Sequence, residues 1–337
     1  MTIALLITID VESDDLWAGR AEVTLENIRA MPRLHAFFGR MGVIPTYLLS
    51  YPVATSAVGR EVFGPVARDG TGEIGSHMHV WTTPPLREIS GRDHAYGPLA
   101  SELSYDEVHA KLASVTAAVG ELAGYAPVSH RAGRYALDGA GLRALEALGY
   151  RADTSVAPMM SWTFPRHGGG TRGPDYRRAP IAPYYPSRDA VDRPGDSPVL
   201  QVPLSYYLTR RLPLGLTERV ARLPRNATVA RALRWSGVAR LGWLRPGRDT
   251  SARQMVNVAE TLIADGCPVL NVMFHSSEMA LGTSPHTRTE ADVEDSYRQL
   301  EGLFRALLAR GDVTPMTLGG YAEHYAATQA GRPGKGA

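Results

Sequence analysis

Short apolar runs alternate with longer segments of helical periodicity through the first half of the chain and again near its end. The first run, Ile3 to Ile9, consists almost wholly of leucine and β-branched residues, which predicts a buried strand. Apolar residues then recur at helical spacing from Thr24 to Gly42, and Val43 to Leu49 predicts the next strand. The same reading predicts strands at Gly72–His79, Pro127–His130, Tyr150–Asp153, Pro268–Phe274 and Val313–Met316, and helices at Glu61–Arg68, Ser104–Gly124, Gly139–Gly149, Ser251–Asp265, Glu290–Arg310 and after Leu318. This alternation favours a parallel sheet or barrel.

A long irregular segment, about residues 157–247, separates the two regular regions. It begins rich in glycine and proline and contains one predicted strand at Val199–Leu204. It ends in an arginine-rich stretch, from Arg210 to Arg253. A solvated helix face is the plain interpretation of these arginines, and binding of an anionic ligand or a membrane surface is the functional one. We expect one domain over residues 1–330 that carries this insertion, followed by a flexible tail at residues 331–337.

Composition narrows the class of protein. The chain has 337 residues, 44% hydrophobic and 21% charged, and a net charge of only +2, so nothing global points to nucleic acid. A single cysteine, Cys267, cannot form an internal disulfide, which suits a reducing compartment. The first apolar run is too short for a signal peptide or a membrane span, so a cytoplasmic protein is the default expectation. Formation of a homodimer is an open alternative.

Polar side chains follow two of the predicted strands. Asp10 and Glu12 end the first, and His77 and His79 end the third. Residues two apart on an extended chain point the same way, so each pair can face one pocket at the carboxyl end of a parallel sheet. Two imidazoles and one carboxylate form a ligand set typical of catalytic zinc. An acidic surface loop is the alternative interpretation of the carboxylates.

Three further strand ends carry candidate groups. Arg131 follows the fourth predicted strand and can hold a carboxylate in its ionised form. Asp153 ends the fifth in an Asp-Thr-Ser sequence that a turn would also explain. His275 directly follows the late apolar strand and can serve as a general acid.

The order of these segments resembles the polysaccharide deacetylase family, the NodB-homology carbohydrate esterases related to family 4. Each of the family's five short motifs has a counterpart here, in order, at a predicted strand end. They are Thr8-Ile9-Asp10-Val11-Glu12, Glu73-Ile74-Gly75-Ser76-His77-Met78-His79, Arg131-Ala132-Gly133-Arg134-Tyr135, Asp153-Thr154-Ser155 and Asn271-Val272-Met273-Phe274-His275-Ser276-Ser277-Glu278. The resemblance covers about residues 1–155 and 255–325.

Two departures from the family pattern bear on the metal. The common first motif has adjacent aspartates, whereas Val11 separates the two carboxylates here. The common second motif spaces its histidines four apart, which would place the second at Trp81. Three alternatives stay open: His79 replaces the second histidine, the metal has one protein ligand fewer, or the site works without metal.

The resemblance implies a distorted (β/α) barrel of seven or eight strands that hydrolyses the N-acetyl group of an amino sugar. It implies a divalent metal, expected to be zinc, on Glu12, His77 and His79. The implied roles of the other residues are proton acceptor for Asp10, orientation of that carboxylate for Arg131, support of the site for Asp153, general acid for His275, and substrate contact for Trp81, Arg134 and Tyr135. We expect a small N-acetylated glycan, antibiotic precursor or glycolipid precursor as substrate. The alternatives are a metal-independent amidohydrolase acting on a non-sugar amide and a non-catalytic carbohydrate-binding protein.

Overall fold

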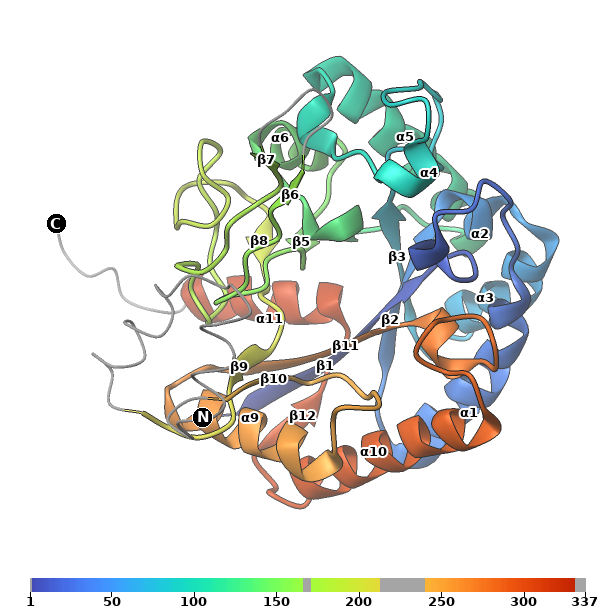
Figure 1. Cartoon of the computed structure of the whole chain (residues 1–337). Helices are drawn as coiled ribbons and strands as arrows, with labels where there is room; N and C mark the ends of the chain where they lie inside the picture. The colour runs from blue at the N-terminus through green and yellow to red at the C-terminus, as the bar shows by residue number, and fades with distance from the viewer. Residues whose placement is uncertain (1, 166–170, 213–239, 331–337) are drawn as a thin grey trace, which may run out of the picture.

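Strand β1 (Ile3–Val11) lies at the centre of the main sheet, and all nine of its residues are buried. It pairs along one edge with β11 (Val269–His275) and along the other with β2 (Pro45–Ser50), while β12 (Val313–Pro315) pairs with its first residues. The computed structural model describes residues 2–165, 171–212 and 240–330 (Figure 1). An apolar run buried on both faces suits a strand covered by other elements on each side.

The sheet continues from β2 through the other regular strands of the first half. Its order is β11-β1-β2-β3-β4-β5-β8, with β3 (Glu73–Met78), β4 (Ser129–Ala132), β5 (Ala152–Asp153) and β8 (Leu200–Gln201), and every pairing is parallel. Beyond β8 the chain reaches the free edge of β11, where the amide of Ser205 donates to the carbonyl of Asn271 at 3.4 Å. The sheet is thus a distorted barrel, which confirms the predicted fold class.

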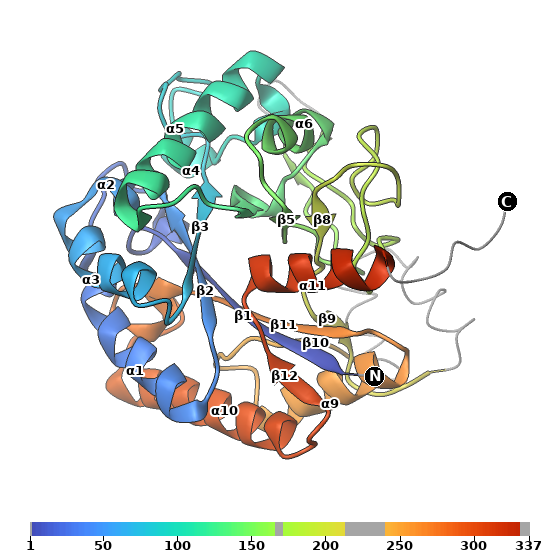
Figure 2. The same cartoon turned by 180° about the vertical axis from the view of Figure 1, so that it is seen from behind.

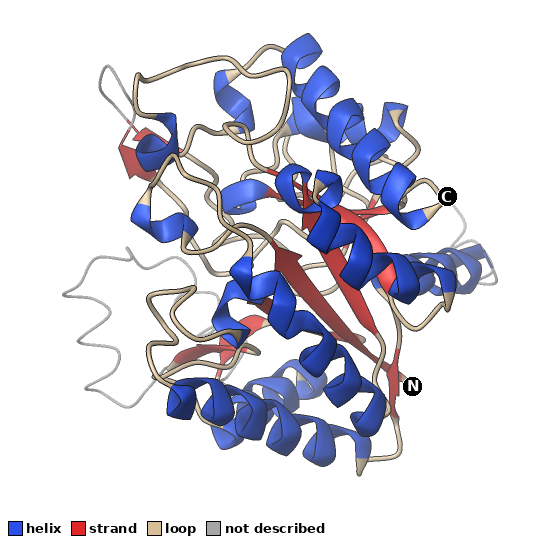
Figure 3. Cartoon of the chain, turned by 90° about the vertical axis from the view of Figure 1, so that its right-hand side faces the viewer, coloured by secondary structure: helices blue, strands red, loops and turns tan. Residues whose placement is uncertain are grey.

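Helices surround the strands, as Figure 3 shows. They are α1 (Met31–Met41), α2 (Tyr51–Thr55), α3 (Ala57–Arg68), α4 (Asp93–Tyr96), α5 (Tyr105–Ala123), α6 (Gly139–Ala147), α9 (Ala252–Ala264), α10 (Glu290–Leu308) and α11 (Leu318–Ala330), with short 3₁₀ turns η1 (Leu16–Ala18), η2 (Glu26–Ala30), η3 (Ala100–Glu102), η4 (Gly133–Tyr135) and η5 (Ser276–Met279). Helix α11 crosses the amino end of the barrel (Figure 2), where the amide of Gly319 donates to Glu73 at 2.8 Å. The predicted polar side chains lie at the opposite end of the barrel, at the carboxyl ends of the strands. Among the described residues, no helix is both long and apolar enough to cross a lipid bilayer.

Two helices differ from the sequence prediction near their starts. The helix expected from Thr24 is split into η2 and α1, because Asp14 accepts hydrogen bonds from the amides of Glu26 and Asn27 and Pro32 occupies the first turn of α1. Helix α3 starts before Glu61, with Ser56 accepting from the amide of Gly59 as its N-cap. The helix predicted from Ser104 is present as α5, and Ser104 and Glu107 form a capping box at its start.

The insertion is built partly from short antiparallel pairs. β6 (Phe164–Pro165) pairs with β7 (Thr171–Arg172), and β9 (Tyr206–Leu208) pairs with β10 (Leu241–Trp243). The strand predicted at Val199–Leu204 is reduced to β8, which joins the main sheet. Most of the arginine-rich stretch and the predicted tail lie outside the described residues.

Candidate active site

The carboxyl ends of three strands bring the predicted polar groups to one pocket. Asp10 and Glu12 come from the end of β1, His77 from β3 with His79 just beyond it, and His275 from the end of β11. All of them line a cavity of about 400 Å³. The expectation that these side chains lie together is therefore met in the structure, while their roles remain predictions.

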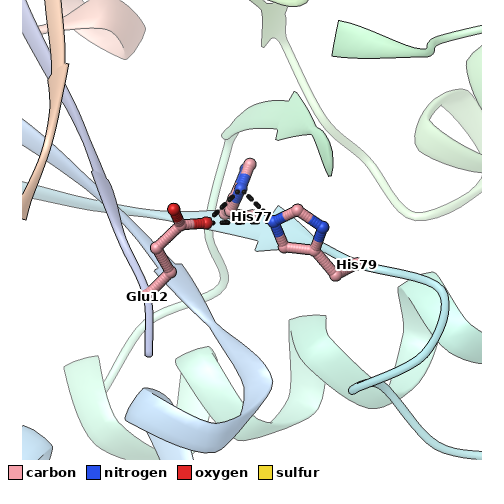
Figure 4. A group of neighbouring side chains, drawn as sticks. All are labelled: Glu12, His77 and His79. Carbon is pink, nitrogen blue, oxygen red and sulfur yellow. Dashed lines mark hydrogen bonds and ion pairs between the residues drawn. The ribbon is translucent and has the colours of Figure 1, made fainter. Parts of the chain in front are cut away.

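Glu12, His77 and His79 form a tight cluster with their ligand atoms turned toward one another (Figure 4). His79 Nε2 lies 3.0 Å from His77 Nε2 and 3.0 Å from Glu12 Oε2, and His77 Nε2 lies 3.3 Å from the same oxygen. Ligands about 2.1 Å from a tetrahedral zinc ion lie about 3.3 Å apart, so the triangle has the size of one face of such a site. Of the three alternatives raised by the sequence, this geometry favours His79 as the second histidine.

The hydrogen bonds of His77 also suit a metal ligand. Its Nδ1 lies 2.9 Å from the carbonyl oxygen of Arg131, an acceptor, so Nδ1 carries the proton and Nε2 presents a lone pair. Two imidazole nitrogens that face each other at 3.0 Å need either a proton or a cation between them. Burial alone would raise the pKa of Glu12, but the charge of His275 and hydrogen bonds from the clustered histidines lower it well below its ordinary range. The donor set therefore fits a divalent cation.

The carboxylate of Asp10 is fixed by Arg131, which is fully buried beneath the pocket. Arg131 Nη1 donates to Asp10 Oδ1 at 2.5 Å, its Nη2 donates to the hydroxyl of Thr8, and its Nε donates to the carbonyl of Thr154 at 3.0 Å. Arg131 is 0% exposed. One carboxylate oxygen of Asp10 is thus fixed by the guanidinium, and the other, Oδ2, is turned toward His275.

The two ring nitrogens of His275 have different neighbours. One faces the carboxylates of Asp10 and Glu12, and the other faces the ion pair between Arg245 and Glu278. Its Nε2 lies 3.8 Å from Asp10 Oδ2 and 3.8 Å from Glu12 Oε1. Its Nδ1 lies 3.4 Å from Glu278 Oε2 and 3.3 Å from Arg245 Nη2. The Nε2 atom is therefore the one available to a group bound in the pocket.

Aromatic side chains form much of the pocket wall. Trp17, Trp81, Tyr135 and Trp162 all line it, and Trp17 is 44% exposed beside His275. Trp81 packs against His79 with ring centroids 4.4 Å apart, and Tyr135 stacks on Trp162 at 4.8 Å. Such surfaces suit the apolar faces of a sugar ring.

Arg134 and Tyr135 adopt an unusual backbone conformation at the pocket. Their φ angles are +55° and +58°, in the left-handed region that side chains other than glycine rarely adopt. Both residues line the cavity, and their contact with a substrate stays a prediction. The turn thereby places two side chains in the pocket directly after β4.

Asp153 lies away from the cavity. Its carboxylate accepts hydrogen bonds from the amide and hydroxyl of Ser155, at 2.7 and 2.9 Å, which is the turn arrangement that its sequence also suggested. Burial raises the pKa of Asp153 to about 7. Arg131 contacts this strand end through the carbonyl of Thr154, and support of the site by Asp153 stays a prediction.

Several residues of the pocket and site were not assigned by the sequence, among them Glu278, Arg245, Trp17 and Trp162. Glu278 is the last residue of the fifth motif, and its position three after His275 was the available signal. Arg245 lies among the arginines of the insertion, Trp17 follows β1 and Trp162 lies in the insertion, and no local pattern distinguishes them. These three are brought to the pocket by the tertiary fold.

Comparison with known proteins adds information on the fold. No family model and no curated protein matches this sequence. A protein from Parabacteroides distasonis described as a glycoside hydrolase/deacetylase aligns with a TM-score of 0.59 at 12% identity, covering 97% of this chain and 71% of that chain. One from Mycobacterium smegmatis, described as a polysaccharide deacetylase, aligns with a TM-score of 0.52 at 16% identity over 97% of this chain and 91% of that chain.

The same fold also occurs in an enzyme of different activity. The 4-alpha-glucanotransferase of Thermococcus litoralis aligns with a TM-score of 0.53 at 12% identity, covering 96% of this chain and 40% of that chain. At such identities the likeness concerns the fold, and the chemistry has to be argued from the site.

Proposed function

We propose that this protein is a metal-dependent hydrolase that removes the N-acetyl group from an amino sugar, giving the free amine and acetate. The observation that carries this proposal is that Asp10 and His275 lie side by side, 3.8 Å apart, in one pocket that also holds the Glu12–His77–His79 cluster. Hydrolysis of an amide needs a proton acceptor for water and a proton donor for the leaving nitrogen. Two proteins described as deacetylases share the fold, which adds support.

Each proton transfer of the reaction can be assigned to a residue of the pocket. Asp10 accepts a proton from water as the water oxygen bonds to the carbonyl carbon of the acetamide. The carbon–nitrogen bond then breaks, and the nitrogen takes a proton from His275 Nε2. Passage of a proton from Asp10 to His275, whose nearest atoms are 3.8 Å apart, restores both groups, so one water is consumed for each amide cleaved.

Glu12, His77 and His79 would hold the metal. Two imidazoles and one carboxylate suit zinc and leave a coordination position open. When bound, the ion would polarise the amide carbonyl and make water easier to ionise. The walls formed by Trp17 and Trp81 would pack on the sugar ring.

A screen of N-acetylated amino sugars tests the proposal by measuring released acetate and free amine. The wild-type protein should be active, and a chelator should abolish the activity until zinc is restored. Activity that a chelator leaves unchanged would instead support the metal-independent amidohydrolase. Sugar binding without release of acetate, under any metal, would support the carbohydrate-binding alternative.

A further inference from the structure

The last part of the insertion runs along the strand that carries His275. The amide of Leu244 donates to the carbonyl of Ser205 at 3.0 Å, and the carbonyl of Leu244 accepts from the amide of Met273 at 3.1 Å. These backbone bonds fix the segment two residues before His275 on β11. Arg245, the next residue, is thereby delivered to the pocket wall.

Arg245, Glu278 and His275 form a closed cluster around the buried carboxylate of Glu278. Arg245 Nη2 donates to Glu278 Oε1 at 2.5 Å, and Glu278 Oε2 accepts from the backbone amide of His275 at 3.0 Å and lies 3.4 Å from its Nδ1. The side chain of Glu278 is 6% exposed and that of Arg245 is 21% exposed. Both oxygens of the carboxylate are thus engaged, one by the arginine and one by the histidine.

We propose that Arg245 is a positioning residue for His275 and acts both through Glu278 and through its own contact with Nδ1 of the imidazole, at 3.3 Å. This inference rests on the proposed function, in which His275 protonates the leaving nitrogen. With one oxygen on Arg245 and the other on the backbone and ring of His275, Glu278 cannot rotate, so the imidazole keeps Nε2 toward Asp10 and Glu12. The insertion therefore contributes to the chemistry of the site as well as to its walls.

The electrostatics of the cluster agree with this arrangement. Burial alone would raise the pKa of the Glu278 carboxyl, but the charge of Arg245 holds it well below its ordinary range. Burial alone would lower the pKa of Arg245, and the carboxylate of Glu278 raises it instead. Removing the arginine would leave a buried carboxylate without its cation, free to turn away from the imidazole.

Arg245→Met tests the proposal through the dependence of the rate on the leaving group. An amine must be protonated as it leaves, whereas a nitrophenolate departs without a proton, so a misplaced acid slows only the amide. We expect kcat for an N-acetyl amino sugar to fall about 100-fold with little change in KM, while hydrolysis of 4-nitrophenyl acetate changes less than about threefold. Glu278→Gln should show the same selectivity, and Arg245→Lys should recover part of the amide activity by retaining a cation.

Arg248→Met is the matched control, because Arg248 lies three residues along the same segment in an ion pair with Asp292, at 2.8 Å, that does not line the pocket. It should leave both rates unchanged. Equal loss on amide and ester in Arg245→Met, or a rise in KM alone, would overturn the positioning role and indicate a structural or substrate-binding one. A wild-type protein inactive on every amide would instead overturn the proposed function. If Arg245→Met does not fold by circular dichroism, Glu278→Gln decides by the same two rates.

Discussion

Asp10 and His275 are register partners in the parallel pairing of β1 with β11, and their side chains approach to 3.8 Å between Oδ2 and Nε2. The two groups that we propose as proton acceptor and proton donor are therefore set by one ladder of backbone hydrogen bonds. In a parallel pair, neighbouring residues of equal register point to the same face. Substitution of either side chain can consequently remove its chemistry without changing where its partner lies.

Asp10→Asn should remove the proton acceptor and should also destabilise the fold, because the buried charge of Arg131 would lose its partner. We expect the deacetylation rate to fall about 1,000-fold. We also expect the free energy of unfolding to fall by about 3 kcal/mol, because Arg131 would keep its charge without an anion. Urea denaturation and acetate release measure the two effects. Glu294→Gln, which breaks the exposed pair with Arg33, is the control and should cost under about 1 kcal/mol. An active Asp10→Asn variant would remove Asp10 from the mechanism.

His79→Ala should lose bound metal, because His79 supplies one vertex of the ligand triangle. Elemental analysis of protein purified without added metal should find about one ion per wild-type chain and much less in the variant. His94→Ala is the control, since His94 lines the same cavity but is not in the cluster. Equal metal content in His79→Ala and wild type would exclude His79 as a ligand.

Gly133→Ala should weaken metal binding by filling the space beside His79. A Cβ at Gly133 would lie 2.6 Å from His79 Nδ1 and 2.7 Å from the carbonyl of Met78, so the imidazole would have to move. We expect metal affinity to fall about 10- to 100-fold, as measured by competition with a chelating dye. Gly120→Ala, in α5 with no neighbour closer than 3.6 Å, should keep the wild-type affinity. Unchanged affinity in Gly133→Ala would show that His79 is not held in this position.

Asp153 should make stability depend on pH. Burial raises the pKa of Asp153 to about 7 from 3.8, so between these values the folded protein keeps a proton that the unfolded chain has lost. The free energy of unfolding should therefore fall as the pH rises, by about 3 kcal/mol from this residue between pH 5 and pH 8. Asp153→Asn has no such proton, so its denaturation curves should lose less stability over the same range. Parallel pH profiles for the two proteins would contradict this assignment.

The convergence of Asp10, Glu12, His77 and His275 could be predicted from the sequence for a simple reason. Each of them follows an apolar run at a strand end, and parallel strands place such ends at one edge of the sheet. The same reasoning also selects Asp153, whose carboxylate closes a local turn with Ser155 and whose support of the site stays a prediction.

Arg245 and Trp162 could not be found in this way. They belong to a segment without periodicity, and their positions depend on backbone contacts such as that between Leu244 and Met273, which join residues far apart in the sequence. Helix boundaries were missed for a related reason, since the break before α1 depends on Asp14, which lies in a preceding loop. Local pattern carries little information on contacts of this kind.

The pairing of β9 with β10 has a consequence for variation among proteins of this architecture. Leu208 and Leu241 are partners in that ladder, and the amide of Thr209 donates to the carbonyl of Arg240 at 2.8 Å, so the two ends of the intervening sequence lie side by side. The sequence between them can change in length and charge while Arg245 stays anchored.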